Sequence, residues 1–179
     1  MTFDAVVAAD LDWGIGKSDG LPWPKLRGDM AHFRRVTTEA PENRMNAVVM
    51  GRKTWLSAEV ARKPLPKRLN IVISHRAITV PDGVLWAASL DAAVDAARRD
   101  PFVDNVFVVG GGEIYRQAFA DPRMRWIYLT RIEGRFGCDI TIPNLDELGF
   151  VSDDWAGACA AEDNGVRYRI ERLKRRPGT

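Results

Sequence analysis

Only two of the 179 residues are cysteine, and only two are histidine. Cys138 and Cys159 form no Cys-x-x-Cys pair, so we expect no disulfide framework and no cysteine-ligated metal site, and both thiols should be reduced. Because histidine is rare and the acids are scattered, we predict no metal cofactor.

Long hydrophobic runs are also missing, and none reaches the roughly 18 residues that a membrane-spanning helix needs. Residues 1–9 lack the cationic segment that begins a secretory signal, so we expect a cytoplasmic protein without a membrane partner. A strong excess of positive charge is also missing, since 26 Lys and Arg against 24 Asp and Glu give a net charge of only +2. We therefore expect no nucleic-acid partner, although small anionic ligands fit this balance. The basic stretch Arg172–Arg176 is interpreted as the solvated end of a strand.

A chain of this length, 46% hydrophobic and 28% charged, can bury one core but is too short for two independent ones. We predict one domain over residues 1–179 and a monomer. Four nearly continuous hydrophobic stretches predict strands covered on both faces, as in a parallel sheet. They are Phe3–Ala9, Asn46–Met50, Asn70–Ile73 and Val103–Val109.

Stretches with helical spacing alternate with these strands. They are Asp29–Thr37, Ser89–Arg99 and Glu113–Phe119, and Ser89 is placed to cap its helix. Trp126–Thr130 and Val166–Leu173 predict strands without a strong helix between them, which favours antiparallel pairing. The sequence therefore predicts an α/β fold: a central, mostly parallel twisted sheet with an antiparallel C-terminal edge and helices on both faces.

Three glycines, Gly110–Gly112, come directly after the strand that ends at Val109 and directly before a helix. Glycine lets a ligand approach the backbone closely, and the free N–H groups of a helix N-terminus favour a phosphate. A tight turn that needs positive φ explains the triplet equally well. Because the triplet is not a Gly-x-Gly-x-x-Gly motif and lies far from the first strand, a Rossmann fold is disfavoured.

Two other strand ends carry groups that suit an anion. Gly51–Trp55 has two cations where a helix begins, which is unfavourable unless an anion lies there too. Ser74–Arg76 supplies a hydroxyl, an imidazole and a guanidinium. Each could instead be a solvated loop. Because ligands bind at the carboxyl ends of parallel strands, the three turns together predict a dinucleotide with an additional phosphate, and NADP(H) is the candidate.

Asp29 and Phe33 are four residues apart and lie on one face of the predicted helix, so the carboxylate would face an apolar cleft. The alternative is that Asp29 stabilises the helix start as a cap or a first-turn acid. His32 points elsewhere on the same turn and is predicted to be a surface residue.

Taken together, these motifs resemble the dihydrofolate reductase family in order and spacing, over about residues 3–173. The motifs that carry the resemblance are Trp13–Gly16, Leu21–Trp23, Asp29, Phe33, Met50–Trp55, Pro64–Pro66 with Arg68 and Asn70, and Val109–Tyr115. The resemblance implies NADPH-dependent reduction of 7,8-dihydrofolate to tetrahydrofolate, with hydride transfer to pterin C6 and protonation of N5. It also implies that antifolate inhibitors bind.

The resemblance assigns roles on the substrate side. Asp29 is similar to the family's buried acid, which binds the pterin 2-amino group and N3 and is supported by Thr130. Arg68 is similar to the arginine that binds the α-carboxylate of the glutamate tail. The implied catalytic residues are Asp29, Trp23, Leu21 and Thr130. The implied substrate-binding residues are Val6, Val7, Leu26, Asp29, Phe33, Leu65, Arg68, Val109 and Thr130.

On the cofactor side, Gly110–Gly111 resembles the family's cis peptide, and Asp12–Trp23 resembles its mobile loop. The implied cofactor-binding residues are Ala8, Ile15, Gly16, Gly51, Arg52, Lys53, Thr54, Ser74, His75, Arg76, Val109, Gly110, Gly111, Gly112, Glu113, Ile114 and Tyr115.

Some positions depart from the family pattern. Ala58 is smaller than the usual aliphatic residue, and Cys138–Pro143 follows the family's run only loosely. Which of His75 and Arg76 meets the 2′-phosphate stays open. Two other functions are considered: a pyrimidine reductase of riboflavin synthesis and a non-catalytic nucleotide-binding module. The first would lack the group Trp23, Asp29 and Phe33, and an assay with NADPH and dihydrofolate would distinguish the second.

Overall fold

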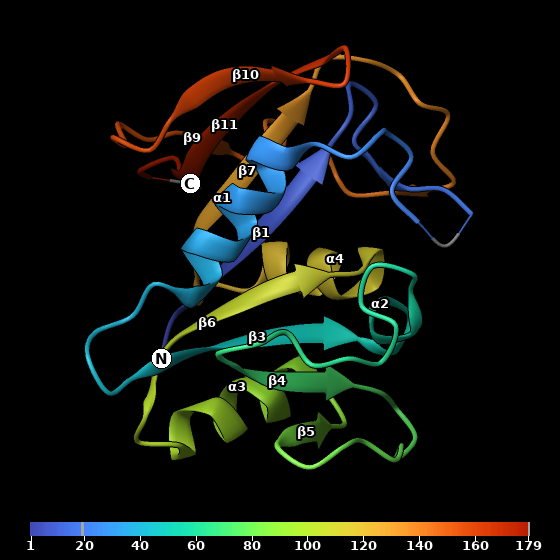
Figure 1. Cartoon of the computed structure of the whole chain (residues 1–179). Coiled ribbons are helices and arrows are strands. Elements are labelled where there is room, and N and C mark those ends of the chain that lie inside the picture. Colours follow the sequence, from blue (N-terminus) through green and yellow to red (C-terminus); the bar gives the residue numbers. More distant parts are fainter. Residues whose placement is uncertain (19, 179) are drawn as a thin grey trace.

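The computed structural model describes residues 1–18 and 20–178, and a twisted sheet runs through the middle of it (Figure 1). Within these residues nine strands form the main sheet, in the order β10-β11-β7-β1-β6-β3-β4-β5, with β9 paired to β11. Its strands are β1 (Phe3–Ala9), β3 (Met45–Gly51), β4 (Arg68–Ile73), β5 (Val84–Ala87), β6 (Val103–Gly110), β7 (Met124–Ile132), β9 (Phe150–Ser152), β10 (Cys159–Asp163) and β11 (Val166–Arg175).

The strands from β7 to β5 are parallel, whereas β9, β10 and β11 are antiparallel to their neighbours. This confirms the predicted mostly parallel sheet with an antiparallel C-terminal edge. A separate ribbon joins β2 (Gly14–Gly16) to β8 (Ile140–Thr141). Sequence patterning missed this ribbon because two or three residues are too few to show a period.

Helices cover both faces of the sheet, as predicted. They are α1 (Arg27–Thr38), α2 (Arg52–Leu56), α3 (Leu90–Arg99) and α4 (Gly112–Ala120). One face packs against α1 and α2 through Phe33, Val36 and Trp55. The other face packs against α3 and α4 in a larger apolar core that includes Val94 and Phe119.

Local signals explain where some elements begin. The Ser89 hydroxyl accepts a hydrogen bond from the N–H of Ala92 at 3.1 Å, so the predicted cap of α3 is confirmed. The N-cap position of α1 is held by Leu26, which has no side-chain group to do the same. Another part of the chain must therefore satisfy the first N–H groups of α1.

The basic stretch at the end of β11 is not the freely solvated strand end that was predicted. Arg172 pairs with Asp153 and lies over the Trp126 ring, 4.1 Å from its centroid. Arg175 donates to the backbone carbonyls of Phe119 and Asp121 at 2.8 and 3.0 Å. These partners are distant in sequence, so the charge run alone could not reveal them.

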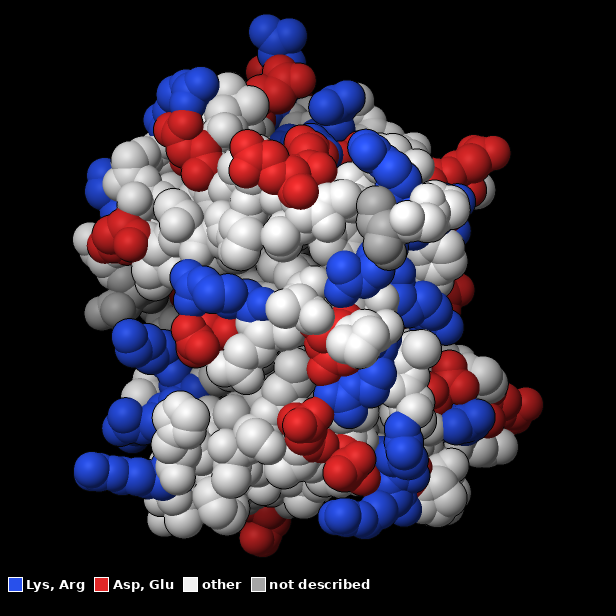
Figure 2. Space-filling view, turned by 180° about the vertical axis from the view of Figure 1, so that it is seen from behind, with Lys and Arg blue, Asp and Glu red and all other residues white. Residues whose placement is uncertain are grey.

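Three further features of the described residues are their surface charge, their hydropathy and their potential metal ligands. The face in Figure 2 mixes Lys and Arg with Asp and Glu over its whole area. Among residues 1–18 and 20–178, no helix is long and apolar enough to cross a membrane. The same residues contain no group of three or more His, Cys, Asp or Glu arranged to hold a metal ion. Cys138 and Cys159 are both free thiols.

Candidate active site

A cleft of about 2040 Å³ runs along the carboxyl ends of the parallel strands. Its walls come from β1, α1, α2, the segment between α2 and β4, the loop after β4, and the turn from β6 into α4. This is the edge where ligands bind to parallel α/β sheets. Of the predicted site residues, the following line it: Val6, Val7, Ala8, Ile15, Gly16, Leu21, Asp29, Phe33, Gly51, Arg52, Lys53, Thr54, Leu65, Arg68, Ser74, His75, Arg76, Val109, Gly110, Gly111, Gly112, Glu113, Ile114, Tyr115 and Thr130.

Asp29 is the acid in the apolar half of this cleft. It is the third residue of α1, and its Oδ1 accepts a hydrogen bond from the Thr130 hydroxyl at 2.6 Å. Thr130 comes from β7 and is buried, so a strand far away in sequence supports the acid. Asp29 is therefore a first-turn acid but not the N-cap, and its carboxyl is directed toward the sheet.

The environment of Asp29 favours its neutral form. Burial raises the pKa of the Asp29 carboxyl, the hydrogen bond from Thr130 opposes this rise, and the negative charge of Asp163 adds to it. A carboxyl with a raised pKa in an apolar cleft is a candidate functional group.

Cations lie at the outer end of this half. The Arg68 guanidinium donates to the Thr37 hydroxyl and to the Pro66 carbonyl, each at 2.9 Å, which fixes its direction. Burial lowers the pKa of Arg68, and the nearby charge of Arg34 lowers it further. Like charges placed together favour an anionic ligand.

The other half of the cleft begins where β6 passes into α4. The Gly110–Gly111 peptide is cis, as the resemblance implied. Gly110 has φ +143°, and a Cβ atom there would lie 2.8 Å from the Thr54 hydroxyl oxygen. Glycine is thus required at this turn by both conformation and space. The Tyr115 hydroxyl donates to the Val6 carbonyl at 2.6 Å, so this phenol is occupied within the protein.

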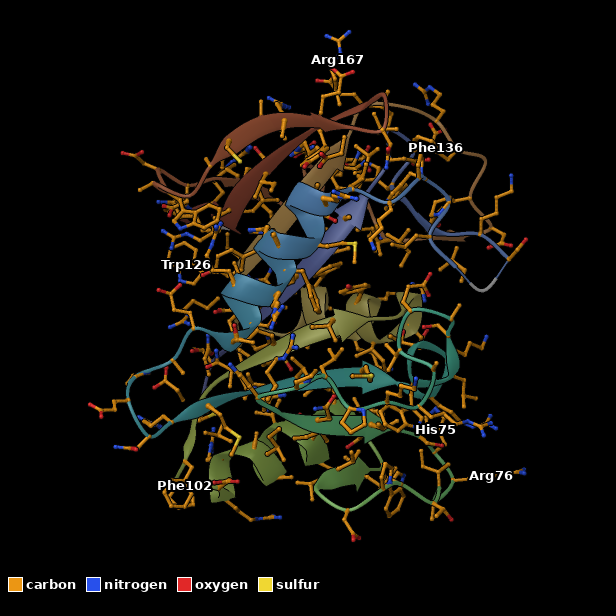
Figure 3. All side chains as sticks on the ribbon, in the orientation of Figure 1. His75, Arg76, Phe102, Trp126, Phe136 and Arg167 are labelled. Carbon is orange, nitrogen blue, oxygen red and sulfur yellow. The ribbon has the colours of Figure 1, made fainter. Side chains whose placement is uncertain are left out.

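Positive groups surround this second half. Arg52 and Lys53 begin α2, and His75 and Arg76 lie on the loop that follows β4, where Figure 3 shows them side by side at one edge of the molecule. The carboxylate of Glu113, at the start of α4, accepts hydrogen bonds from its helix neighbours Arg116 and Gln117. Glycine backbone, a helix start and four cationic or imidazole side chains form a donor set that suits phosphate groups.

Two predicted site residues do not line the cleft. Trp23 and Leu26 are 5% and 2% exposed and belong to a separate apolar cluster with Ile132, Tyr168 and Ile170. Leu26 therefore packs beneath the start of α1, and its implied contact with the substrate stays a prediction. Helix periodicity could not show this, because Leu26 precedes the helix and its direction depends on β11.

His32 was predicted to be on the surface, and this is wrong. It is 2% exposed and packs against the rings of Tyr128 and Trp155, with centroids 6.4 and 5.9 Å away. Neither ring nitrogen has a hydrogen-bond partner within the described residues. Trp155 covers this side of α1 from the segment after β9, and a long-range contact of this kind leaves no mark in the local sequence.

The predicted mobile loop, residues 12–23, is held at both ends in this structure, with residue 19 outside the described part. β2 pairs with β8, and the N–H of Leu21 donates to the Glu59 carboxylate at 3.0 Å. Sequence reasoning missed Glu59 because it lies in an irregular segment. It also missed other residues that line the cleft: Met30, Arg34, Arg35, Lys67, Arg116, Gln117, Asp139, Ile140 and Thr141. Arg34 and Arg35 follow Phe33 directly in the sequence, and this neighbourhood could have indicated that they also line the cleft.

The fold and the cleft define a class: a single-domain α/β protein in which an apolar pocket with one buried acid adjoins a cationic, glycine-rich groove. A family model described as dihydrofolate reductase matches residues 2–175, and the chain belongs to this family of oxidoreductases. The chain is 36% identical over 176 residues to the dihydrofolate reductase of Rattus norvegicus, covering 94% of each.

Other similarities agree with this assignment. The chain is 39% identical over 174 residues to the bifunctional dihydrofolate reductase-thymidylate synthase of Daucus carota, of which it spans 32%. The solved structure of Schistosoma mansoni dihydrofolate reductase is similar with a TM-score of 0.84 and 36% identity, covering 97% of this chain and 98% of that one. The resemblance found in the sequence is thus confirmed, and the riboflavin-pathway alternative is not favoured.

Proposed function

We propose that this chain reduces 7,8-dihydrofolate to 5,6,7,8-tetrahydrofolate with NADPH as the hydride donor. The observation that carries the proposal is the Asp29 carboxyl, supported by Thr130 at 2.6 Å and set in the apolar half of a cleft whose other half suits phosphates. A pterin anchor at Asp29 and a dinucleotide groove beside it would bring the two reacting rings next to each other, as hydride transfer requires.

In the substrate half, the carboxylate of Asp29 accepts hydrogen bonds from the pterin 2-amino group and N3. Val6, Phe33 and Leu65 line the cleft around it and exclude water from the ring. The guanidinium of Arg68 binds the α-carboxylate of the glutamate tail, since its Nε and one Nη are already held in direction by Pro66 and Thr37. Antifolate inhibitors that carry the same donors would occupy this half.

In the cofactor half, Arg52, Lys53, Ser74, His75 and Arg76 would hold phosphates, and the Gly110–Gly112 turn leaves room for a close approach. NADPH, when bound, supplies the hydride that reduces pterin C6. Ala8, Ile15 and Tyr115 line the cleft between the halves and keep it apolar. The Tyr115 hydroxyl donates to the Val6 carbonyl, so it is already occupied within the protein.

N5 of the pterin receives a proton during the reaction. Asp29 anchors the opposite side of the ring, so we propose that it orients a water molecule toward N5 and favours the protonated pterin. The raised pKa of Asp29, caused first by burial, keeps a proton available in the cleft at higher pH than an exposed aspartate would.

We further propose that the protein acts as a cytoplasmic monomer.

The substitution Asp29→Asn tests the proposal. The amide keeps the shape of the side chain but presents an N–H group to the pterin donors, which leaves buried polar groups unpaired at roughly 1–3 kcal/mol each. Dihydrofolate turnover, followed by loss of NADPH absorbance, should fall at least about a hundredfold, or about 2.7 kcal/mol in barrier. NADPH affinity should hardly change.

The exposed Asp95→Asn on α3 provides the matched control and should keep full activity. In the parent, the rate should decrease as pH rises through the raised pKa of Asp29, and substrate at low pH should partly rescue Asp29→Asn. Normal kcat of Asp29→Asn from about pH 5 to 9 would show that Asp29 only stabilises the helix start.

A further inference from the structure

The start of α1 is capped from a distant part of the chain. Leu26 holds the N-cap position, and its side chain offers no acceptor. The N–H of Gly28, the second residue of the helix, instead donates to Oδ2 of Asp163 at 2.9 Å. Asp163 is the last residue of β10, so its carboxylate takes the place of an N-cap side chain.

Tyr168 holds this carboxylate in place. Its hydroxyl donates to the same Oδ2 of Asp163 at 2.5 Å, and the tyrosine is 1% exposed on β11. A Cβ atom at Gly28 would lie 2.2 Å from the Tyr168 hydroxyl oxygen and 3.2 Å from Oδ2 of Asp163. Glycine at position 28 thus allows the helix backbone to approach this pair, which any larger residue would prevent.

A second contact joins the same two segments. The side-chain amide of Asn164, in the turn between β10 and β11, donates to the Lys25 carbonyl at 2.5 Å. The β10–β11 hairpin therefore contacts the chain on both sides of Leu26. Because Asp29 follows Gly28 directly, the hairpin contacts the residue next to the acid that lines the cleft.

We propose that Asp163 is a positioning residue for Asp29, because its carboxylate replaces the missing cap of α1 and so fixes where the Asp29 carboxyl lies relative to Thr130. This inference rests on the proposed function only where it concerns turnover. Asp163 does not line the cleft, and it acts through the helix backbone.

The charge of Asp163 has a second effect on the same acid. Hydrogen bonds from Tyr168 and from the Gly28 N–H lower the pKa of Asp163, so it is an anion at neutral pH. Three causes act on the pKa of Asp29. Burial raises it most, the hydrogen bond from Thr130 lowers it, and the negative charge of Asp163 raises it further. The other titratable groups that sense Asp29 are the phenols of Tyr115 and Tyr168.

Two substitutions separate the two effects. Asp163→Asn removes the charge but keeps an oxygen that can accept from Gly28, whereas Asp163→Ala removes both. Glu162→Gln, at the exposed preceding residue, is the matched control for a lost negative charge on β10. Asp163→Asn also covers the case in which Asp163→Ala fails to fold.

The first readout needs no substrate. In the free protein, amide hydrogen exchange reports the Gly28 N–H, and carbon NMR of labelled aspartate reports the titration of Asp29. We expect Gly28 exchange to accelerate about tenfold in Asp163→Ala, as for the loss of a cap of ordinary strength, and to change little in Asp163→Asn. The Asp29 titration should move to lower pH in both, and Glu162→Gln should leave both signals unchanged.

The second readout is turnover. Asp163→Ala should lower kcat/KM for dihydrofolate about three- to tenfold with unchanged NADPH affinity, and Asp163→Asn should restore much of the loss while shifting the pH profile to lower pH. Unchanged Gly28 exchange and Asp29 titration in both folded variants would overturn the inference. If both NMR signals move but no dihydrofolate is reduced by any form, the proposed function fails and the positioning of Asp29 stands.

Discussion

At the scale of single residues, the burial of His32 makes the stability of the fold depend on pH. Burial lowers its pKa from the ordinary 6.5 to about 4, and the charge of Arg35 contributes to the shift. Its ring packs against the rings of Tyr128 and Trp155. Protonated His32 would therefore be a buried cation near Arg35, without a hydrogen-bond partner in the described residues.

We predict that this histidine makes the protein less stable as the pH falls from about 6.5 toward 4. In that range the unfolded chain binds a proton that folded His32 does not, so the unfolding free energy decreases, by up to on the order of 3 kcal/mol. Above this range the stabilisation is fully present. Urea unfolding across the pH range measures it.

The substitution His32→Phe keeps an aromatic ring between Tyr128 and Trp155 and removes the titration. Its unfolding free energy should vary less between these pH values than that of the parent. His75→Gln, which replaces the exposed histidine, should keep the parent's pH dependence. If His32→Phe and the parent lose stability in parallel, the loss arises from other groups.

At the scale of elements, the β2–β8 ribbon depends on one buried carboxylate. Oδ1 of Asp10 accepts the N–H groups of Asp12 and Gly14, each at 2.9 Å, and Oδ2 accepts the N–H of Phe136 at 3.0 Å. Burial opposes ionisation of Asp10, but the bonds from Phe136, Gly14 and Asp12 outweigh it and lower the pKa. Asp10 thus joins the segment that carries β2 to the segment that leads into β8.

We predict that Asp10→Asn weakens this connection and leaves the local turn intact. The amide oxygen can still accept from Asp12 and Gly14, but its NH₂ group would face the Phe136 N–H and leave that donor unpaired, at roughly 1–3 kcal/mol. Denaturant unfolding should show this loss. Asp12→Asn, which removes an exposed ion pair with Arg135, should cost less than about 1 kcal/mol. Equal losses in the two variants would contradict the role of Asp10.

At the scale of the whole molecule, the cleft collects side chains from elements that are far apart in the chain. Arg52 from α2 and His75 and Arg76 from the loop after β4 provide more positive charge than a pyrophosphate needs. We predict a preference for NADPH over NADH of at least about tenfold in kcat/KM, or about 1.4 kcal/mol. NADPH at a concentration far above its Kd should also raise the unfolding temperature more than the same concentration of NADH.

The double variant His75→Ala and Arg76→Ala should reduce this preference, and the two single variants show which residue meets the 2′-phosphate. Arg98→Ala, at an exposed arginine of α3, should leave the preference unchanged. Equal use of both cofactors by the parent would refute the cofactor assignment.

The sequence by itself determined the features that depend on local chemistry. Continuous apolar stretches predicted the central strands because both faces of a parallel sheet are buried. Ser89 predicted the start of α3 because its hydroxyl caps a neighbouring N–H. Glycines and cations at three strand ends predicted one edge with room for phosphates, and Gly51, Ser74 and Gly110 do line one cleft.

Only the tertiary structure decided which side chains these elements cover or support. His32 is buried because Trp155 packs on α1, and Leu26 faces the cluster around Tyr168 instead of the cleft. Asp163 caps α1 through its contact with Gly28, which lies 135 residues earlier in the chain. Such pairings depend on how the antiparallel edge lies against α1. Local propensity and periodicity act only over a few residues, so they cannot determine contacts between segments that the fold brings together.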